Sequence, residues 1–402
     1  MANKRIIELE NKDALTGAEY LAIDGADGTY KYLLREITNN YGVYDVTCNV
    51  DRWLRFDATN HKGLIIKQGT LLKKSDGTTY YADTDKPIDL SNQVSTAGAE
   101  YLLYLNDDDT FTASTSEQNS GVKIGRFHTL CADVGTITMI APTEKTTASG
   151  KYLVKPYDPI TDTDFYNFYN KDITSISTGD YYNIATMSHP LSGYTAGDIL
   201  PESVFCLTFK PNSVYEDGMV YDKATDRMID VYLQSGTSHT TRSAYNAVHT
   251  VSRQQPNHEY DMLCVGKELL SDDEFTSASM GSNQATNIIG SSDKSTVGGH
   301  VDTANRRMIS AIGCEEMCGY IYQWLRDVSA TLQANGTSGE WTTYDGRGAF
   351  GQSYYKDSAL WAGGAWNNGS HCGSRCRSSE LVRGTVYPHI GGRGSSRVIR
   401  GH

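Results

Sequence analysis

Short runs of alternating apolar and polar residues dominate the first third of the chain. KGLIIKQGTLLKKSDGTTYYADTD (62–85) contains two such runs divided by a glycine and followed by a DGT turn signal, and EYLLYLNDDDTFTAS (100–114) has the pattern of a hairpin. KIGRFHTLCADVGTITMI (123–140) adds two further strands. Alternation with a period of two is typical of strands that bury one face. These runs predict a β-sandwich or β-prism module over residues 43–150.

Three consecutive aspartates, Asp107, Asp108 and Asp109, occupy the tip of the second hairpin. Carboxylates can bind calcium, but the glycine and the distal glutamate of an EF-hand loop are missing. Aspartate is also a common turn residue because its side chain bonds to nearby backbone N–H groups. We therefore predict a solvated turn here.

The N-terminal stretch LTGAEYLAIDGADGTYKYLLREI (15–37) has two short apolar runs on either side of a Gly/Asp turn signal. It predicts a small β unit, residues 1–42. The stretch resembles the N-terminal attachment region of phage tail fibres. The resemblance implies that this end of the chain binds other tail fibre or baseplate proteins.

Beyond the β-rich region the composition changes. APTEKTTASGKYLVKPYDP (141–159) is rich in Thr, Ser, Lys and Pro, and predicts a linker and a domain boundary between about residues 142 and 161. We assign 151–402 to this linker and a C-terminal domain. In LSDDEF, Ser271 and Glu274 have the spacing of a capping box, with Leu270 and Phe275 as a hydrophobic staple, so a helix should begin there. EEMCGYIYQWLRDV (315–328) fits either a buried strand or a short helix. The predicted class is therefore α+β overall.

Composition excludes several functions. The 402 residues carry a formal net charge of −12, which argues against general nucleic-acid binding because such binding requires clustered Lys and Arg. We find no secretory signal and no apolar stretch long enough to span a bilayer, so we expect synthesis in the cytosol and no membrane insertion. Eight cysteines in a chain of this length are too few for a disulfide scaffold, and we expect mostly free thiols.

Two cysteine pairs are the main candidates for chemistry. Cys314 and Cys318 are four residues apart, as are Cys372 and Cys376, and His371 precedes the second pair. Zinc, a native disulfide or ordinary thiols fit this spacing, and the missing finger or ribbon context favours thiols. Adjacent residues usually point apart, so His371 and Cys372 make a poor catalytic dyad. Hydrolase, metalloprotease, P-loop and dinucleotide motifs are missing. We expect no enzyme activity, no metal and no cofactor.

Four motifs occur in a recognisable order: GKELLSDDEF (266–275), GGHVDTANRRMISAIGCEEMCGYIYQWLRD (298–327), WAGGAWNNGSHCGSRCRSS (361–379) and IGGRGSSRV (390–398). They resemble the variable proteins of diversity-generating retroelements, which have the formylglycine-generating-enzyme (FGE) type of C-type lectin fold. The resemblance covers about residues 193–402. It implies N-terminal β-rich modules followed by a C-type-lectin-like (FGE-type) display domain.

The resemblance also implies a ligand-binding face. In that family the segment after GG.W is rewritten by error-prone reverse transcription, here about residues 361–402. Exposed positions tolerate substitution with little loss of stability, whereas buried ones do not. The fixed residues would be Gly363, Gly364, Trp366, Gly369, Gly373 and 390–394. The variable, ligand-binding residues would be Asn367, Asn368, Ser370, His371, Ser378, Ser379, Glu380, Leu381, Val382, Thr385, Tyr387, Pro388 and His389.

The function implied is that of a phage receptor-binding protein at the tip of a tail fibre, assembled in the host cytoplasm. Its partners would be a bacterial surface receptor, protein or glycan, and further copies of itself in a homotrimer. Two alternatives remain open: a cellular or prophage-encoded diversified lectin-like protein, and an FGE-like oxidase. The oxidases need a cysteine pair after GG.W, where Asn367 and Asn368 stand in this chain. Oxidase activity is therefore not expected.

Overall fold

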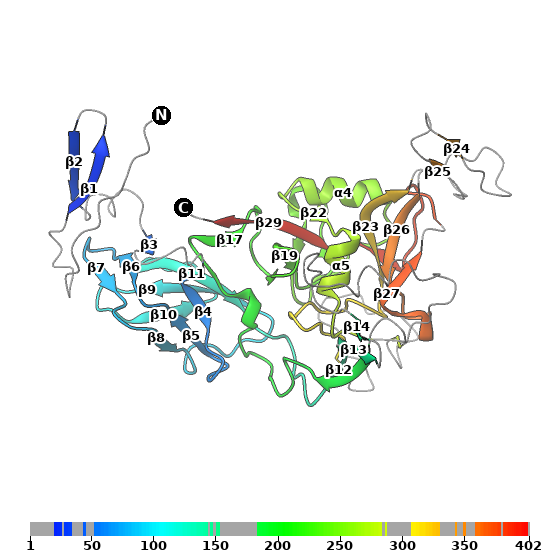
Figure 1. The fold of residues 1–402 in the computed structure, drawn as a ribbon, viewed down its shortest axis with the longest axis horizontal. Helices are drawn as coiled ribbons and strands as arrows, with labels where there is room; N and C mark the ends of the chain where they lie inside the picture. The colour runs from blue at the N-terminus through cyan, green and yellow to red at the C-terminus, as the bar shows by residue number, and fades with distance from the viewer. Residues whose placement is uncertain are drawn as a thin grey trace. The chain divides into compact units, whose positions relative to one another are not determined.

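The computed structural model describes residues 20–25, 28–33, 43–45, 52–143, 145–147, 150–152, 183–283, 286–287, 307–329, 342–343, 349–350, 358–378 and 381–400. The chain divides into two compact units, coloured by residue number in Figure 1. Unit 1 comprises residues 1–129, 197–211 and 398–402, and unit 2 comprises 130–196 and 212–397. The division differs from the modules 1–42, 43–150 and 151–402, which stay predictions, because two late segments return to unit 1.

The N-terminal hairpin is confirmed. Strand β1 (Tyr20–Gly25) pairs antiparallel with β2 (Gly28–Leu33), and Gly25 stands opposite Gly28 at the turn. The turn falls where the DGADGT signal placed it, because Gly and Asp accept the backbone angles that a tight hairpin turn requires.

The main sheet of unit 1 is built around β9 (Glu100–Leu105). It pairs antiparallel with β10 (Phe111–Ser114) and with β11 (Val122–His128). Beyond β11 come β16 (Phe205–Cys206) and β17 (Phe209–Pro211), and β17 pairs with residues 398–400 of β29 (Gly394–Arg400). The last strand of the chain therefore completes a sheet that begins near residue 100.

Two three-stranded sheets complete the strands of unit 1. One has the order β3 (Val43–Asp45), β6 (Thr70–Lys73), β7 (Thr79–Tyr81), and the other β4 (Leu54–Phe56), β5 (Gly63–Ile66), β8 (Lys86–Asp89). The 3-10 turn η2 (Pro201–Ser203) also lies in this unit. The strands and turns predicted from alternation over residues 62–114 are confirmed.

The turn between β9 and β10 contains the three aspartates. Asp109 has a left-handed backbone (φ 64°), and Asp108 Oδ1 accepts hydrogen bonds from both the backbone N–H and the hydroxyl of Thr110. Lys74 Nζ lies 2.7 Å from Asp109 Oδ1. The prediction of a turn is confirmed: Asp108 bonds within the turn, while Asp107 accepts hydrogen bonds from Ser75 and Asp76 of the neighbouring hairpin.

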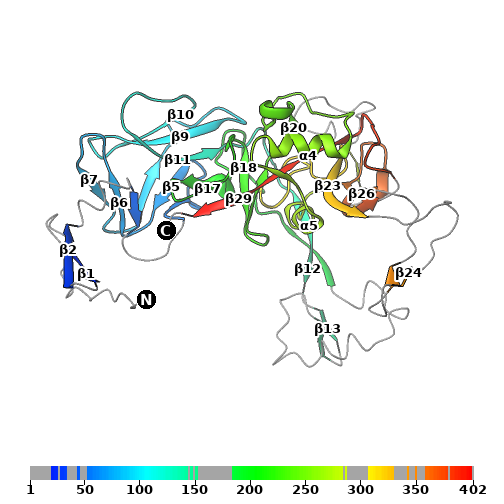
Figure 2. The ribbon, with the colours of Figure 1, turned by 90° about the horizontal axis from the view of Figure 1, so that it is seen from above.

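Figure 2 shows the strands and helices of unit 2 from above. The central sheet has the order β27 (Gly373–Ser378), β26 (Ser358–Gly363), β23 (Tyr322–Ser329), β28 (Ile390–Gly391). Residues 395–397 of β29 pair with β19 (Arg227–Asp230), which pairs with β18 (Met219–Asp222), and β22 (Glu268–Leu269) also pairs with β29. The remaining pairs are β12 (Thr138–Thr143) with β15 (Asn183–Ser188), β13 (Lys145–Thr147) with β14 (Gly150–Tyr152), β20 (Gln234–Ser235) with β21 (Arg242–Ser243), and β24 (Thr342–Thr343) with β25 (Ala349–Phe350).

The α-helices of the described residues are α4 (Gln255–Leu263) and α5 (Asp272–Ala278), and Figure 1 shows both near β23. The 3-10 turns η3 (Ser238–Thr240) and η4 (Gly369–His371) also lie in unit 2. The described chain is therefore mainly β, and the α+β class stays a prediction for the whole. Residues 145–147 and 150–152, within the predicted linker, form the β13–β14 hairpin, and residues 153–161 lie outside the described part.

Helix α5 begins as the sequence predicts. Ser271 Oγ accepts a hydrogen bond from the Glu274 backbone N–H at 3.2 Å, and Glu274 Oε2 accepts one from the Ser271 N–H at 3.0 Å. Leu270 and Phe275, the predicted staple, are both fully buried. The capping box satisfies two N–H groups that a helix start leaves without partners. The prediction of this helix is confirmed.

The ambiguous segment 315–328 is a strand over most of its second half. β23 pairs antiparallel with β26 and parallel with β28, so it lies inside the sheet. Its near-continuous apolar pattern arises because both faces of this part of the sheet are covered.

Candidate binding face

The C-terminal segment consists of sheet strands and the loops that join them. Strands β26, β27 and β28 belong to the central sheet; η4 lies between β26 and β27, and residues 381–389 lie between β27 and β28. Trp361 stands opposite Ser378 across the β26–β27 pair, and Gly363 stands opposite Gly373. The loops therefore leave from strands whose register is fixed by the sheet.

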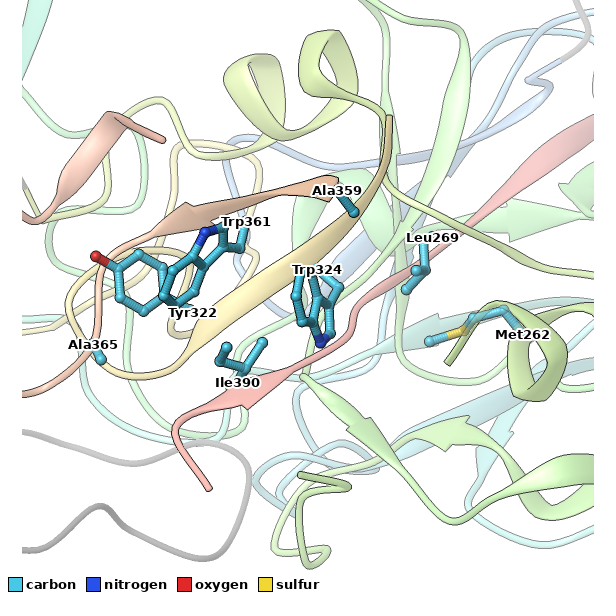
Figure 3. Packing of buried hydrophobic residues seen from close by; sticks show 8 residues of the cluster. All are labelled: Met262, Leu269, Tyr322, Trp324, Ala359, Trp361, Ala365 and Ile390. Atoms are coloured by element: carbon cyan, nitrogen blue, oxygen red, sulfur yellow. The ribbon is translucent and has the colours of Figure 1, made fainter. Parts of the chain in front are cut away.

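A cluster of aromatic side chains lies beneath these loops (Figure 3). The ring centroids of Tyr322 and Trp361 are 4.3 Å apart, and those of Trp324 and Trp361 are 6.1 Å apart. Ile390 packs in the same cluster, and Leu381 of the loop packs against it. Trp361 is thus a core residue of the cluster against which the loop residue Leu381 packs.

Two adjacent glycines turn the chain at the end of β26. Gly363 (φ 90°) and Gly364 (φ 84°) both have left-handed backbones. A Cβ atom on Gly364 would lie 2.7 Å from the Cys372 sulfur, and one on Gly363 would lie 2.6 Å from the Met317 carbonyl oxygen. Only glycine meets both requirements, which agrees with the fixed role predicted for these positions.

Gly392 and Gly394 are restricted by close packing and not by a left-handed backbone. Gly394 is buried in β29, and a Cβ there would lie 2.5 Å from Asp230 Oδ2; one on Gly392 would lie 3.0 Å from Gln234 Oε1. The two glycines, which belong to the predicted fixed residues 390–394, thus allow close packing at and beside β29.

The predicted ligand-binding residues divide by exposure. Those that are exposed are Asn367, Ser370, His371, Val382, Tyr387 and Pro388. Those that are partly buried are Asn368, Ser378, Leu381, Thr385 and His389, while Ser379 and Glu380 lie outside the described residues. Of the described positions, Ser378 ends β27 and the others lie at or next to η4 or in residues 381–389. That they bind a ligand stays a prediction.

Three of the partly buried positions also have structural contacts. Asn368 Oδ1 accepts a hydrogen bond from the Ala365 N–H at 2.9 Å, and Ser378 pairs with Trp361 in the sheet. Leu381 packs against the aromatic cluster. Substitution at these three positions should be restricted by packing more than at the exposed ones.

The ring of His389 contacts two other aromatic rings, those of Trp366 and Tyr387. The His389 ring lies 5.6 Å from that of Trp366, edge to face, and 5.0 Å from that of Tyr387. Tyr387 is 41% exposed, and its neighbour Val386 is 48% exposed. Val386 was missed by the sequence reasoning. The signal was its place between two predicted residues, Thr385 and Tyr387, in a segment without strand or helix periodicity.

The arginine of GGRGSS is buried. Arg393 donates from Nη1 to the carbonyl oxygens of Asp230 and Val231 at 2.8 and 2.6 Å, and from Nη2 to that of Glu315. Burial lowers the pKa of its guanidinium. This arginine holds backbone segments together inside the domain and does not reach the face.

The cysteine chemistry is unfavourable for catalysis. Burial raises the pKa of Cys372 to about 11 and also raises that of Cys376, so little reactive thiolate forms at neutral pH. The Cys372 thiol donates to the Ala365 carbonyl oxygen at 3.3 Å. Described cysteines 131, 206, 264, 314, 318, 372 and 376 are free thiols. Within the described ranges, no group of three or more His, Cys, Asp or Glu side chains could hold a metal ion.

No protein-family model and no curated protein matches the chain. Among solved structures it is similar to the Major Tropism Determinant U1 and M1 variants, each with a TM-score of 0.62 at 19% identity, covering 95% of this chain and 93% of theirs. The Major Tropism Determinant I1 variant has the same TM-score and identity and covers 96% of both chains. This similarity confirms the predicted fold resemblance, which includes a lectin-like domain. The similarity covers 95–96% of this chain.

Proposed function

We propose, from the fold shared with the tropism determinant variants, that this chain is a receptor-binding protein at the tip of a phage tail fibre. The protein would attach the virion to a bacterial surface receptor, protein or glycan, through the loops of residues 367–371 and 381–389. The observation that carries the proposal is that the fold match spans 95% of the chain. The action would be adsorption without bond chemistry.

The division of the segment into buried and exposed positions supports diversification. Gly363, Gly364 and Gly373 are buried beneath the loops, whereas Asn367, Ser370 and Tyr387 are exposed. Substitutions at exposed positions usually change the free energy of unfolding by about 0.5 kcal/mol or less, so many sequences could share this fold. We infer that the exposed codons are the ones rewritten.

The partners follow from the same proposal. The N-terminal hairpin would bind other tail fibre or baseplate proteins, and the chain would form a homotrimer after assembly in the host cytoplasm. Several copies on one virion would bind together, and linked binding can add about 100-fold or more to a weak single contact. No helix of the described ranges is long and apolar enough to cross a membrane.

An adsorption assay tests the binding face. Tyr387→Ala should reduce binding of the full chain to envelopes of the host bacterium. Tyr81→Ala is the matched control, since Tyr81 is 44% exposed and lies in unit 1. Equal binding by both variants would contradict the proposed face, and absence of envelope binding by the parent chain would contradict the proposed function.

Sequencing of codons 361–402 across sibling phages tests diversification. Changes at exposed positions that trace to adenines in a nearby template repeat would support it, and an invariant segment without a repeat would oppose it. Neighbouring tail genes would separate a virion protein from a cellular or prophage-encoded lectin. The raised thiol pKa values of Cys372 and Cys376 disfavour the oxidase alternative.

A further inference from the structure

Arg377 fixes the start of the binding loop to helix α5. Its Nε lies within hydrogen-bond distance of Asp272 Oδ1, and its Nη2 donates to Thr276 Oγ1 at 2.8 Å. The guanidinium carbon also lies 4.7 Å from the centre of the Phe275 ring. The arginine thus contacts a carboxylate, a ring and a hydroxyl that lie on one face of α5, at positions i, i+3 and i+4.

Arg383 fixes the following part of the loop to helix α4. Its Nε donates to Gln255 Oε1 at 2.7 Å, and its Nη2 donates to Glu259 Oε2 at 2.6 Å. Its own carbonyl oxygen accepts the Gln255 N–H at 3.0 Å. Gln255 also donates to Glu259 at 2.7 Å, so the three side chains form one network. Both the side chain and the backbone of Arg383 are therefore bound to the first turns of α4.

The hydrogen bonds described above join Arg377 to α5 and Arg383 to α4, and Arg377 Nη1 also donates to the backbone carbonyl oxygens of Ser374 and Cys376. Val382, next to Arg383, is 41% exposed and belongs to the predicted variable set. The contacts that place the loop are thus separate from the side chains that it displays.

We propose that Arg377 and Arg383 are positioning residues that hold the loop on α5 and α4, so that its conformation survives substitution at the exposed positions. The inference rests on the proposed function and explains how a diversified face could keep its shape. Both arginines would be excluded from diversification, although they lie inside the diversified segment. They bind no ligand themselves, because their charged groups already face carboxylates.

Hydrogen exchange on the full chain is the first test. Arg383→Ala should increase amide exchange over residues 381–389 about tenfold, with β23 and β26 unchanged, because only the loop loses its attachment. Glu259→Gln should give a smaller increase over the same residues, and Arg383→Lys should restore part of the protection. The control is Arg52→Ala, which removes an arginine with a carboxylate partner (Glu202, 2.8 Å) in unit 1.

A substitution library is the second test, and it requires no receptor. Positions 367, 370, 371, 382, 385, 387 and 388 would be randomised in the parent chain and in the Arg383→Ala chain, and protease-resistant clones counted. We expect the resistant fraction to fall several-fold when Arg383 is replaced. Equal fractions, or increased exchange spread through β23 and β26, would overturn the inference. A loss of envelope binding alone would bear only on the proposed function.

Discussion

Arg393 donates a hydrogen bond from Nε to Oε1 of Gln323 at 3.0 Å, and neither side chain has any exposed surface. The two residues come from β23 and from the turn before β29. The same guanidinium satisfies three backbone carbonyl groups. The core of unit 2 is therefore joined by a charged side chain with a complete set of partners.

Arg393→Met should be strongly destabilising. It would leave buried carbonyl oxygens and Gln323 without a donor, and breaking a buried charged network typically costs about 3–5 kcal/mol. Urea unfolding measures the loss. Arg397→Met, at an exposed position of β29, is the control and should change the free energy of unfolding by about 0.5 kcal/mol or less. Similar losses in both variants would show that the network contributes little.

Stability should fall in mild acid because of two buried histidines. Burial lowers the pKa of His258 from 6.5 to about 3, and that of His189 to about 4. The unfolded chain binds these protons below about pH 6.5, and the folded chain does not until pH 3–4. The free energy of unfolding is thus highest above pH 6.5 and decreases as the pH falls through this window.

Melting temperatures between pH 7 and pH 4 measure this effect. His258→Gln should flatten the decrease, because it removes one of the two titrating groups. The glutamine amide can still donate to Gln234 Oε1, which His258 contacts at 2.6 Å. Ser370→Ala, an exchange of a non-titrating residue on the exposed turn η4, should leave the slope as it is. An unchanged slope for His258→Gln would contradict the expectation that the His258 imidazole stays neutral in the folded protein over this pH range.

Ser271→Ala should remove the cap of α5. The loss of an N-cap hydroxyl typically costs about 1 kcal/mol. Ser277→Ala, in the interior of the same helix, should be neutral or slightly stabilising because alanine is the better helix former. Thermal unfolding of the two variants gives the comparison. A cost confined to Ser277→Ala would show that the capping box does not contribute.

Cys372 should react slowly with alkylating reagents in the folded protein. With its pKa raised to about 11 from 9.0, the thiolate at pH 8 should be on the order of 100-fold scarcer than in the unfolded chain. Mass spectrometry after timed labelling, with and without urea, measures the ratio. Fast labelling of the native protein would revive the oxidase reading.

Local signals predicted the elements that depend on neighbouring residues. The β9–β10 hairpin follows from alternation and turn residues, and the start of α5 from Ser271 and Glu274, three residues apart. Helix α4 was not predicted, although Pro256 stands at its first turn, because its N-cap Gln254 makes no capping bond and its apolar face is weak. The segment 315–328 stayed ambiguous because a strand covered on both faces loses its alternation.

Contacts between distant segments could not be predicted. The partners of Arg377 and Arg383 lie 105 and 124 residues earlier in the chain, and the carbonyl groups bound by Arg393 include one 163 residues earlier. The residue type alone does not show whether the guanidinium of an arginine contacts solvent, a helix or the core. The candidate ligand-binding positions came from the resemblance, which gives positions and no contacts, and their role in binding stays a prediction.

The split of β29 between two units has a consequence for synthesis. Its residues 395–397 pair within unit 2, and residues 398–400 close a unit 1 sheet whose other strands start at residue 100. A growing chain on the ribosome therefore makes strand β9 about three hundred residues before β29, the strand that pairs with β17 in the same sheet. Translation that stops before residue 394 would leave β17 and β19 without their β29 partner, so a truncated copy would expose unpaired strand edges and should be degraded more readily.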